Sequence, residues 1–285
     1  MRVGVIGHKG YEGLPEMLRM LHRDAPGLGV ELRFEKTLQE LAQVGERLDA
    51  LDEIDALITL GGDGTLLRGA RLLAGKPAPI LGINLGRLGF LTTCGSEDAE
   101  KALEILASGK YVAEARMSLA ARAVDQKGNN RQEWLALNDF VLHKGGFARV
   151  VRLSVSIDGE SIGVYAADGV IISTPTGSTA YSLSAGGPVV VPTVESIILT
   201  PISAHMLAVR PLVIAPDAEV TVETIQNPEE LIVTVDGQVG TNLQSGEKLI
   251  VRRAPNPVRI VRFPDTSFFV RLRKKLGWGG LPETE

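Results

Sequence analysis

The stretch of the chain best suited to chemistry is Gly61-Gly-Asp-Gly64, in which three glycines surround a single carboxylate. The apolar run Ala56–Leu60 before it predicts a strand, and the leucine and alanine spacing over Leu66–Leu73 predicts a helix after it. The glycines remove every Cβ around Asp63, so a polyanionic ligand can approach backbone amides at the start of the helix. The pattern therefore predicts a phosphate site with one acid inside it.

Two interpretations of Asp63 are open at this point. It can be a helix N-cap, a position for which aspartate is a preferred residue. Alternatively, it can accept the proton of a hydroxyl group that attacks a phosphoryl group held by the glycines, since phosphoryl transfer asks the protein mostly for positioning and electrostatics. The loop lacks the Lys-Ser/Thr of a Walker A motif and the third glycine of the dinucleotide fingerprint, so neither of those sites is predicted.

A second polar stretch, Thr174–Pro188, is dense in serine, threonine and glycine and follows the predicted buried strand Gly169–Ser173. This composition suits a flexible linker, but Tyr181 and Leu183 would anchor the segment. As a site, it would offer hydroxyls and backbone amides to the ribose, amide and phosphate groups of a nucleotide. Asp168, just before the strand, can accept from an adenine amino group or ribose hydroxyls, or can simply form an Asp-Gly turn.

A third polar group, Asn138-Asp139, interrupts a strand pattern. Such a pair often satisfies a β-bulge, and it can equally grip a ribose diol, because a carboxylate accepts two hydroxyl protons. Among the histidines, His205 is the candidate for lining the site. The spacing of His, Cys and carboxylates predicts no metal site built by the protein, so a divalent ion such as Mg²⁺ would be carried by the phosphates.

The elements that must position these residues alternate through the first third of the chain. Strands are predicted at residues 2–6, 30–34, 56–60 and 79–83, and helices at residues 13–23, 38–48, 66–73 and 97–107. This alternation predicts a parallel sheet with crossover helices, in which ligands bind at the carboxyl ends of the strands. Residues 7–9, 61–64 and 84–86 follow three such strands, and we expect them to line one edge of the sheet.

After about residue 110 the hydrophobic period changes from 3.6 to 2. Strands are predicted at residues 118–125, 133–142, 152–157, 169–173, 211–215, 219–225, 231–235, 248–253 and 258–263. Asp158-Gly159 and Asp236-Gly237 are hairpin signals. We therefore predict an α/β plus all-β chain: a Rossmann-like α/β domain at residues 1–110 and a β-sandwich domain at residues 111–264. A terminal helix at residues 267–276 should bring the segment 265–285 back onto the first domain.

Composition restricts the class of protein. The 285 residues are 44% hydrophobic, which suits one or two domains with sizeable cores. A net charge of −4 and well-spread basic residues predict neither a nucleic-acid nor a membrane partner, and the cluster of Arg271, Arg273, Lys274 and Lys275 is expected to be a solvated helix end. The chain has a lone cysteine, no signal-peptide pattern and no apolar run of about 18 residues, so a reducing, cytoplasmic setting is expected.

Taken in order, Gly61-Gly-Asp-Gly64, Asn138-Asp139, Thr174–Pro188 and His205–Leu212 give the chain a close resemblance to bacterial NAD kinases over nearly its whole length. The glycine-aspartate loop alone is shared with diacylglycerol, sphingosine and phosphofructokinase families, whereas the serine/threonine-rich run is highly specific. The resemblance implies transfer of the terminal phosphoryl group of ATP, or in some members of polyphosphate, to the 2′-hydroxyl of the adenosine ribose of NAD. It also implies the two-domain fold predicted above and a homodimer or homotetramer.

The same resemblance implies roles for individual residues. Asp63 matches the family's proton acceptor and Gly64 a dinucleotide contact, while Asn138 and Asp139 match a ribose-binding pair that is more often Asn-Glu. The further NAD contacts that it implies are Arg149, Ala166 through its backbone, Asp168, Thr179, Ala180, Tyr181, Ser182, Leu183, Ser184 and Gln238. The phosphate donor is expected at Gly61, Gly62 and Arg68.

Two other functions are weighed against this one. A lipid kinase of the diacylglycerol type shares the glycine-aspartate loop, but its substrate would need an apolar groove, and the polar run Thr176–Ser184 argues against one. A non-catalytic NAD or NADP sensor would keep the pocket, but it would gain little from placing the carboxylate of Asp63 among phosphates.

Overall fold

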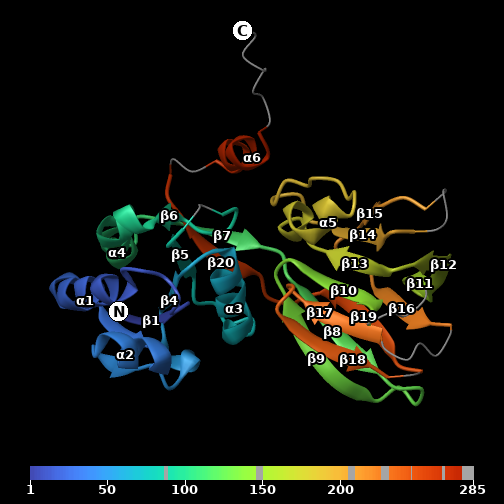
Figure 1. Ribbon diagram of the computed structural model, residues 1–285, viewed down its shortest axis with the longest axis horizontal. Helices are drawn as coiled ribbons and strands as arrows, with labels where there is room; N and C mark the ends of the chain where they lie inside the picture. The colour runs from blue at the N-terminus through green and yellow to red at the C-terminus, as the bar shows by residue number, and fades with distance from the viewer. Residues whose placement is uncertain are drawn as a thin grey trace, which may run out of the picture. The chain divides into compact units, whose positions relative to one another are not determined.

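The computed structural model describes residues 1–86, 89–145, 150–204, 209–225, 231–244, 246–264 and 267–277. The chain divides into two compact units, one formed by Met1–Ala115 with Val258–Glu285 and the other by Arg116–Pro257 (Figure 1). The predicted boundaries at residues 110 and 264 differ from this division because β7 (Val112–Arg116) and β20 (Val258–Arg262) both belong to the sheet of the first unit. A period of two predicts a strand, but it does not say which sheet the strand joins.

The first unit is built on an eight-stranded sheet. Its other strands are β1 (Arg2–Gly7), β2 (Glu31–Phe34), β3 (Glu46–Arg47), β4 (Ala56–Leu60), β5 (Ile80–Asn84) and β6 (Cys94–Gly95). The order is β3-β2-β1-β4-β5-β20-β7, with β6 also paired to β5. Strands β4 and β5 are buried at every residue, as expected for parallel strands covered on both faces.

Helices cover both faces of this sheet (Figure 1). They are α1 (Leu14–Asp24), α2 (Lys36–Ala42), α3 (Asp63–Leu73) and α4 (Ala99–Ser108), with 3₁₀ turns η1 (Ala25–Leu28), η2 (Leu51–Glu53) and η3 (Ser96–Asp98). A further helix, α6 (Phe268–Leu276), lies apart from the two faces of the sheet. The predicted helix at residues 38–48 is too long. It ends at Ala42 because Gln43 adopts a left-handed conformation with φ of 54°, and the chain then enters β3.

The strand order confirms that the segments after three neighbouring strands lie at one edge of the sheet. Strands β1, β4 and β5 are neighbours and parallel, so their carboxyl ends meet at one edge of the sheet. The segments that follow them are joined there by backbone hydrogen bonds from His8 N to Leu60 O and from Gly61 N to Ile83 O, each 3.0 Å long. The glycine loop therefore lies beside the ends of two other strands.

The second unit is a sandwich of two six-stranded sheets, ordered β15-β14-β13-β10-β17-β18 and β12-β11-β16-β19-β8-β9. The strands are β8 (Leu119–Val124), β9 (Asn130–Ala136), β10 (Asp139–Lys144), β11 (Val151–Ile157), β12 (Glu160–Ala167), β13 (Gly169–Ser173), β14 (Ile197–Ile202), β15 (Leu212–Ile214), β16 (Val220–Thr224), β17 (Leu231–Val235), β18 (Val239–Leu243) and β19 (Lys248–Arg253). Alternate residues of both sheets form one buried core, which confirms the predicted β-sandwich.

Both predicted hairpins are present in the sandwich. Asp158 and Gly159 have φ of 51° and 82° between β11 and β12, and Asp236 and Gly237 have φ of 50° and 64° between β17 and β18. The strands β12, β14 and β18 were not predicted, although two of them are the second arms of these hairpins. Exposed residues on β12 and β18 blur the alternation that identifies a half-buried strand.

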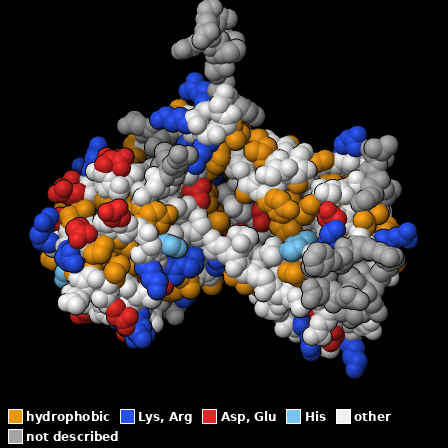
Figure 2. Space-filling model, viewed as in Figure 1, with side chains coloured by type: hydrophobic (Ala, Val, Ile, Leu, Met, Phe, Trp, Pro, Cys, Tyr) orange, Lys and Arg blue, Asp and Glu red, His pale blue; other side chains and the backbone are white. Residues whose placement is uncertain are grey.

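Acidic and basic side chains are interspersed over the first unit on the face drawn in Figure 2. In the described part of the chain, no helix is both long enough and apolar enough to cross a membrane.

Candidate active site

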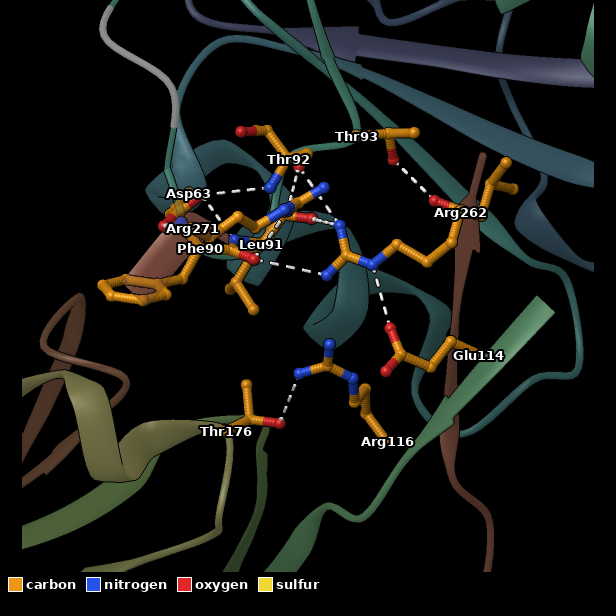
Figure 3. Close-up of polar contacts among 11 residues, drawn as sticks. Asp63, Phe90, Leu91, Thr92, Thr93, Glu114, Arg116, Thr176, Arg262 and Arg271 are labelled. Carbon is orange, nitrogen blue, oxygen red and sulfur yellow. Dashed lines mark hydrogen bonds and ion pairs between the residues drawn. The ribbon is translucent and has the colours of Figure 1, made fainter. Parts of the chain in front are cut away.

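Asp63 is the first residue of α3, and Gly62 is the N-cap, so the interpretation of Asp63 as the N-cap is wrong. Its carboxylate instead receives hydrogen bonds from three consecutive backbone N–H groups of a distant loop (Figure 3). Phe90 N donates to Oδ2 at 2.7 Å, and Leu91 N and Thr92 N donate to Oδ1 at 3.0 and 3.1 Å. These bonds hold the carboxylate at the N-terminus of α3, where the helix dipole also favours a negative charge.

A carboxylate has about four lone-pair positions, and the three hydrogen bonds from this loop leave one of them on Oδ2. Asp63 is partly exposed, so a hydroxyl group can reach that position. Gly89, which precedes the loop, is needed for this geometry because a Cβ there would lie 1.9 Å from Oδ1 of Asp63. The arrangement provides one fixed oxygen that can accept a proton.

Glycine is required at different positions of the loop for different structural reasons. Gly61 has φ of 152°, and a Cβ on it would lie 2.3 Å from the Thr65 hydroxyl, so only glycine fits there. A Cβ on Gly62 would meet nothing closer than the Tyr11 hydroxyl at 3.9 Å, and Gly64 is exposed. Gly62 therefore leaves open space over the backbone, as a phosphate cradle requires.

Arg68, predicted to contact the phosphate donor, is paired with Glu35 in this structure. Its guanidinium lies 2.5 and 2.8 Å from the two Glu35 carboxylate oxygens and 2.9 Å from the carbonyl oxygen of Gly7. Burial by itself would raise the pKa of Glu35, but the hydrogen bonds and charge of Arg68 hold that pKa below its ordinary value. Arg68, in the middle of α3, thus joins this helix to the end of β1 and to Glu35 after β2, and its contact with a donor stays a prediction.

A cavity of about 500 Å³ lies in the second unit, on the sheet face opposite the sandwich core. Five of the predicted site residues line it together: Asn138, Asp139, Asp168, Ala180 and Tyr181. The other lining residues are Val141, His143, Lys144, Ile202, Thr234, Asp236 and Gly237. Three segments that are far apart in the sequence therefore meet at one cavity.

Strand alternation explains how β10 supplies this wall. Phe140 and Leu142 point into the sandwich core, so Asp139, Val141 and His143 point to the opposite face. Asp139 is only 3% exposed. Burial, together with the negative charge of the neighbouring Asp236, raises the pKa of the Asp139 carboxyl to about 7.

Asp236 holds the break between β9 and β10 in place. Its carboxylate accepts hydrogen bonds from the backbone N–H groups of Leu137, Asn138 and Asp139 at 3.4, 2.8 and 3.4 Å. The strand break at Asn138-Asp139 is thus stabilised by a side chain from the β17–β18 hairpin. The sequence around Asp236 indicates only a turn residue, because the partners of Asp236 lie about a hundred residues earlier in the chain.

Asp168 lies where the chain passes from β12 in one sheet to β13 in the other. Its carboxylate is 2.7 Å from the ammonium group of Lys144, which also lines the cavity. The backbone N–H of Lys144 donates to the carbonyl of Asp168 at 3.1 Å. Lys144 was not predicted as a site residue, although it is the last residue of β10, the strand that also carries Asp139 and His143.

The serine/threonine-rich run is ordered structure, so the linker interpretation is wrong. It forms the 3₁₀ turn η4 (Gly177–Thr179) and the short helix α5 (Tyr181–Ser184). The buried Ser178 hydroxyl donates to Pro175 O at 2.7 Å, and the buried Ser182 hydroxyl is 2.8 Å from that of Thr200. These hydroxyls fold the segment against the sheet, while Ala180 and Tyr181 line the cavity.

The other predicted contacts are not among the described residues that line this cavity. The described lining of the cavity does not include Ala166, Thr179, Ser182, Leu183, Ser184 or Gln238. Arg149 and His205 lie outside the described residues. Among the described residues, no three His, Cys, Asp or Glu side chains are grouped as ligands for a metal ion.

Comparison with known proteins identifies the family. The ATP-NAD kinase N-terminal domain matches residues 21–111, and the ATP-NAD kinase C-terminal domain matches residues 137–263. An NAD kinase of Gemmatimonas aurantiaca is 62% identical over 281 residues, covering 99% of this chain and 97% of that protein. An NAD kinase of Heliobacterium modesticaldum is 45% identical over 82% of both chains.

Solved structures give the same result. A yeast NADH kinase complexed with NADH matches with a TM-score of 0.89 at 26% identity, covering all of this chain and 90% of that one. An NAD kinase from Archaeoglobus fulgidus in complex with ATP matches with a TM-score of 0.75 at 27% identity, covering 97% and 98% of the two chains. With the sequence match extending over nearly the whole length, the chain belongs to the NAD kinase family.

Proposed function

We propose that this NAD kinase transfers the terminal phosphoryl group of ATP to the 2′-hydroxyl of the adenosine ribose of NAD, giving NADP and ADP. The observation that carries the proposal is the cavity of the second unit, where Asn138, Asp139 and Asp168 meet. A carboxyl, a carboxylate and an amide offer the donors and acceptors that ribose hydroxyls and an adenine amino group need. The family relation to an NADH kinase complexed with NADH supports the same class of ligand.

In the proposed reaction, the 2′-hydroxyl oxygen forms a bond to the terminal phosphorus of ATP. The bond between that phosphorus and the bridging oxygen breaks, and ADP leaves with its electron pair. The hydroxyl proton passes to Oδ2 of Asp63, the oxygen that accepts only one hydrogen bond from the loop. The open backbone at Gly62 is the expected place for donor phosphates, and Gly61 sets the turn that presents it. A Mg²⁺ ion would be carried by the ATP phosphates, where it would neutralise charge during transfer.

The substitution Asp63→Asn tests the base. It keeps the shape of the side chain but removes proton acceptance, so we expect kcat to fall by about 10²- to 10⁴-fold while NAD binding is retained. The measurements are NADP formation from NAD and ATP and calorimetric titration with NAD. Glu104→Gln, which neutralises an exposed acid on α4, is the matched control and should change neither quantity. Near-normal turnover in purified Asp63→Asn would refute the base role.

A panel of substrates tests the rest of the proposal. ATP and polyphosphate are compared as donors, NAD and NADH as acceptors, and a diacylglycerol is included as the acceptor of the competing lipid kinase. We further propose, from the family resemblance alone, a cytoplasmic homodimer or homotetramer, which light scattering of the purified protein would test. Formation of phospholipid without NADP would overturn the assignment of the acceptor.

A further inference from the structure

The loop that holds Asp63 is itself held from its other side by two arginines (Figure 3). The N–H groups of Phe90, Leu91 and Thr92 face the Asp63 carboxylate, as described above, and the carbonyl oxygens of the same three residues face Arg262 or Arg271. Arg262, on β20, donates to Leu91 O, Thr92 O and Phe90 O at 2.8, 3.1 and 3.3 Å. Arg271, on α6, donates to Phe90 O and Thr92 O at 2.8 and 2.5 Å.

Two peptide groups therefore connect the arginines to the acid. The peptide between Phe90 and Leu91 accepts from Arg271 at its oxygen and donates to Asp63 at its nitrogen. The peptide between Leu91 and Thr92 accepts from Arg262 and donates to Asp63 in the same way. Hydrogen bonds in such a chain polarise one another, so each guanidinium strengthens the N–H group that binds the carboxylate.

The burial of these arginines is hard to explain by packing alone. Arg271 is 6% exposed and Arg262 is 7% exposed, so both lie away from water. Arg271 and Leu272 are the buried residues of α6, whereas Phe269 of the same helix is 58% exposed. Because α6 buries an arginine and exposes a phenylalanine, we infer that the hydrogen bonds of Arg271 fix the position of this helix more than hydrophobic contacts do. The expectation that the cluster beginning at Arg271 is a solvated helix end is thus wrong for Arg271.

Arg262 is oriented by a second group. Its Nε lies 2.9 Å from Oε2 of Glu114 on β7, which turns the other two nitrogens of the guanidinium toward the loop carbonyls. Thr93, the next residue along the loop, donates to Val261 O at 2.6 Å and ties the loop to β20 directly. The loop position is therefore set by both β20 and α6, two elements from the end of the chain.

We propose that Arg262 and Arg271 are positioning residues for Asp63, acting through the Phe90–Thr92 peptides to fix the carboxylate for proton acceptance. The proposal rests on the proposed function of Asp63 as the base. Neither arginine touches the reacting atoms. Their substitution should therefore lower turnover without a comparable loss of substrate affinity, because the loop and the carboxylate become free to shift.

The test uses the full chain with Arg271→Gln, Arg262→Gln and the charge-keeping variants Arg271→Lys and Arg262→Lys, which guard against loss of folding. Arg273→Gln is the control on α6, where the side chain is exposed. Arg259→Gln is the control on β20, because Arg259 also donates to a carbonyl, that of Pro77 at 3.1 Å. All six are compared with the unmodified protein in NADP formation and in hydrogen-deuterium exchange.

We expect each glutamine variant to lower kcat by about 10- to 100-fold, since a displacement near 1 Å can cost that much. KM for NAD should change by less than about threefold, as expected for an interaction that serves the transition state. In an Asp63→Asn background the same substitutions should lower the residual rate no further, because the group they position is gone. The lysine variants should be intermediate, and both controls should match the unmodified protein.

Hydrogen-deuterium exchange supplies a result that does not depend on catalysis. The amides of Phe90, Leu91 and Thr92 should exchange faster in Arg271→Gln and Arg262→Gln, and at the ordinary rate in the two controls. The proposal is overturned if kcat and exchange both stay unchanged, if kcat falls without faster exchange, or if kcat falls by the same factor in the Asp63→Asn background. Absence of kinase activity in the unmodified protein would remove the proposed function, and exchange would still decide whether the arginines hold the loop.

Discussion

Replacing Asp139 with asparagine should stabilise this protein, and more so as the pH rises. Asp139 is almost completely buried beside Asp236, which makes its ionised form unfavourable in the folded chain. Asparagine has the same shape, carries no charge and can donate to the Asp236 carboxylate. The substitution therefore removes the unfavourable ionisation and keeps the packing of the strand.

The size of the effect follows from the pKa. A rise from 3.8 to about 7 corresponds to up to about 4 kcal/mol of unfavourable ionisation in the folded chain. Well below pH 3.8 the carboxyl group is neutral in both states, and the unmodified protein keeps its full stability. As the pH rises, the unfolded chain ionises first, so this stability falls until the folded carboxyl ionises near pH 7. The variant should gain about 1.5 kcal/mol at pH 5 and about 4 kcal/mol at pH 8.

Urea unfolding of the full chain at several pH values between 5 and 8 measures this difference directly. The control is Glu160→Gln, which removes an exposed carboxylate from the same unit and should give no difference that depends on pH. A gain for Asp139→Asn that stays constant or shrinks between pH 5 and pH 8 would show that the Asp139 carboxyl is not held neutral by its surroundings.

Three further substitutions or treatments test the first unit. Gly89→Ala places a methyl group 1.9 Å from Asp63 Oδ1, so kcat should fall about 100-fold and the protein should lose about 1–3 kcal/mol; unchanged kinetics would mean that the loop moves freely. Glu35→Gln removes the partly exposed ion pair with Arg68 and should cost about 1 kcal/mol in urea unfolding, whereas no loss would show that the pair contributes nothing to stability. Burial raises the pKa of the Cys94 thiol to about 12, so iodoacetamide at pH 8 should label it on the order of 10³-fold more slowly in the folded chain than in urea, and equal rates would contradict its burial.

Local sequence patterns were enough to predict much of the fold. The predicted strands at residues 56–60, 169–173, 231–235 and 248–253 have the observed bounds, because β-branched and alternating residues identify a strand without outside help. Gly109 ends α4 in a left-handed conformation, and two Asp-Gly pairs form hairpins, because these conformations depend on the residues themselves.

Contacts between distant segments could not be predicted from local sequence patterns. The N–H groups that hold Asp63 come from a loop 27 to 29 residues later, and the arginines behind that loop come about 170 to 180 residues later. Arg271 was placed in a solvated cluster because it stands among basic residues, and only its partners show that it is buried. Asp236 likewise has the sequence of a turn residue while it holds the strand break at Asn138.

The amino-acid sequence by itself determined the two kinds of domain, the glycine loop with its single acid, and five of the residues that line the second unit's cavity. Each of these depends on residue type and short spacing, which the chain carries locally. Only the tertiary structure decided which oxygen of Asp63 accepts a single hydrogen bond from the loop, how the carboxyl of Asp139 is kept from ionising readily, and which arginines stand behind the Phe90–Thr92 loop. Those properties depend on hydrogen bonds and burial between residues far apart in the chain, and folding alone brings these residues together.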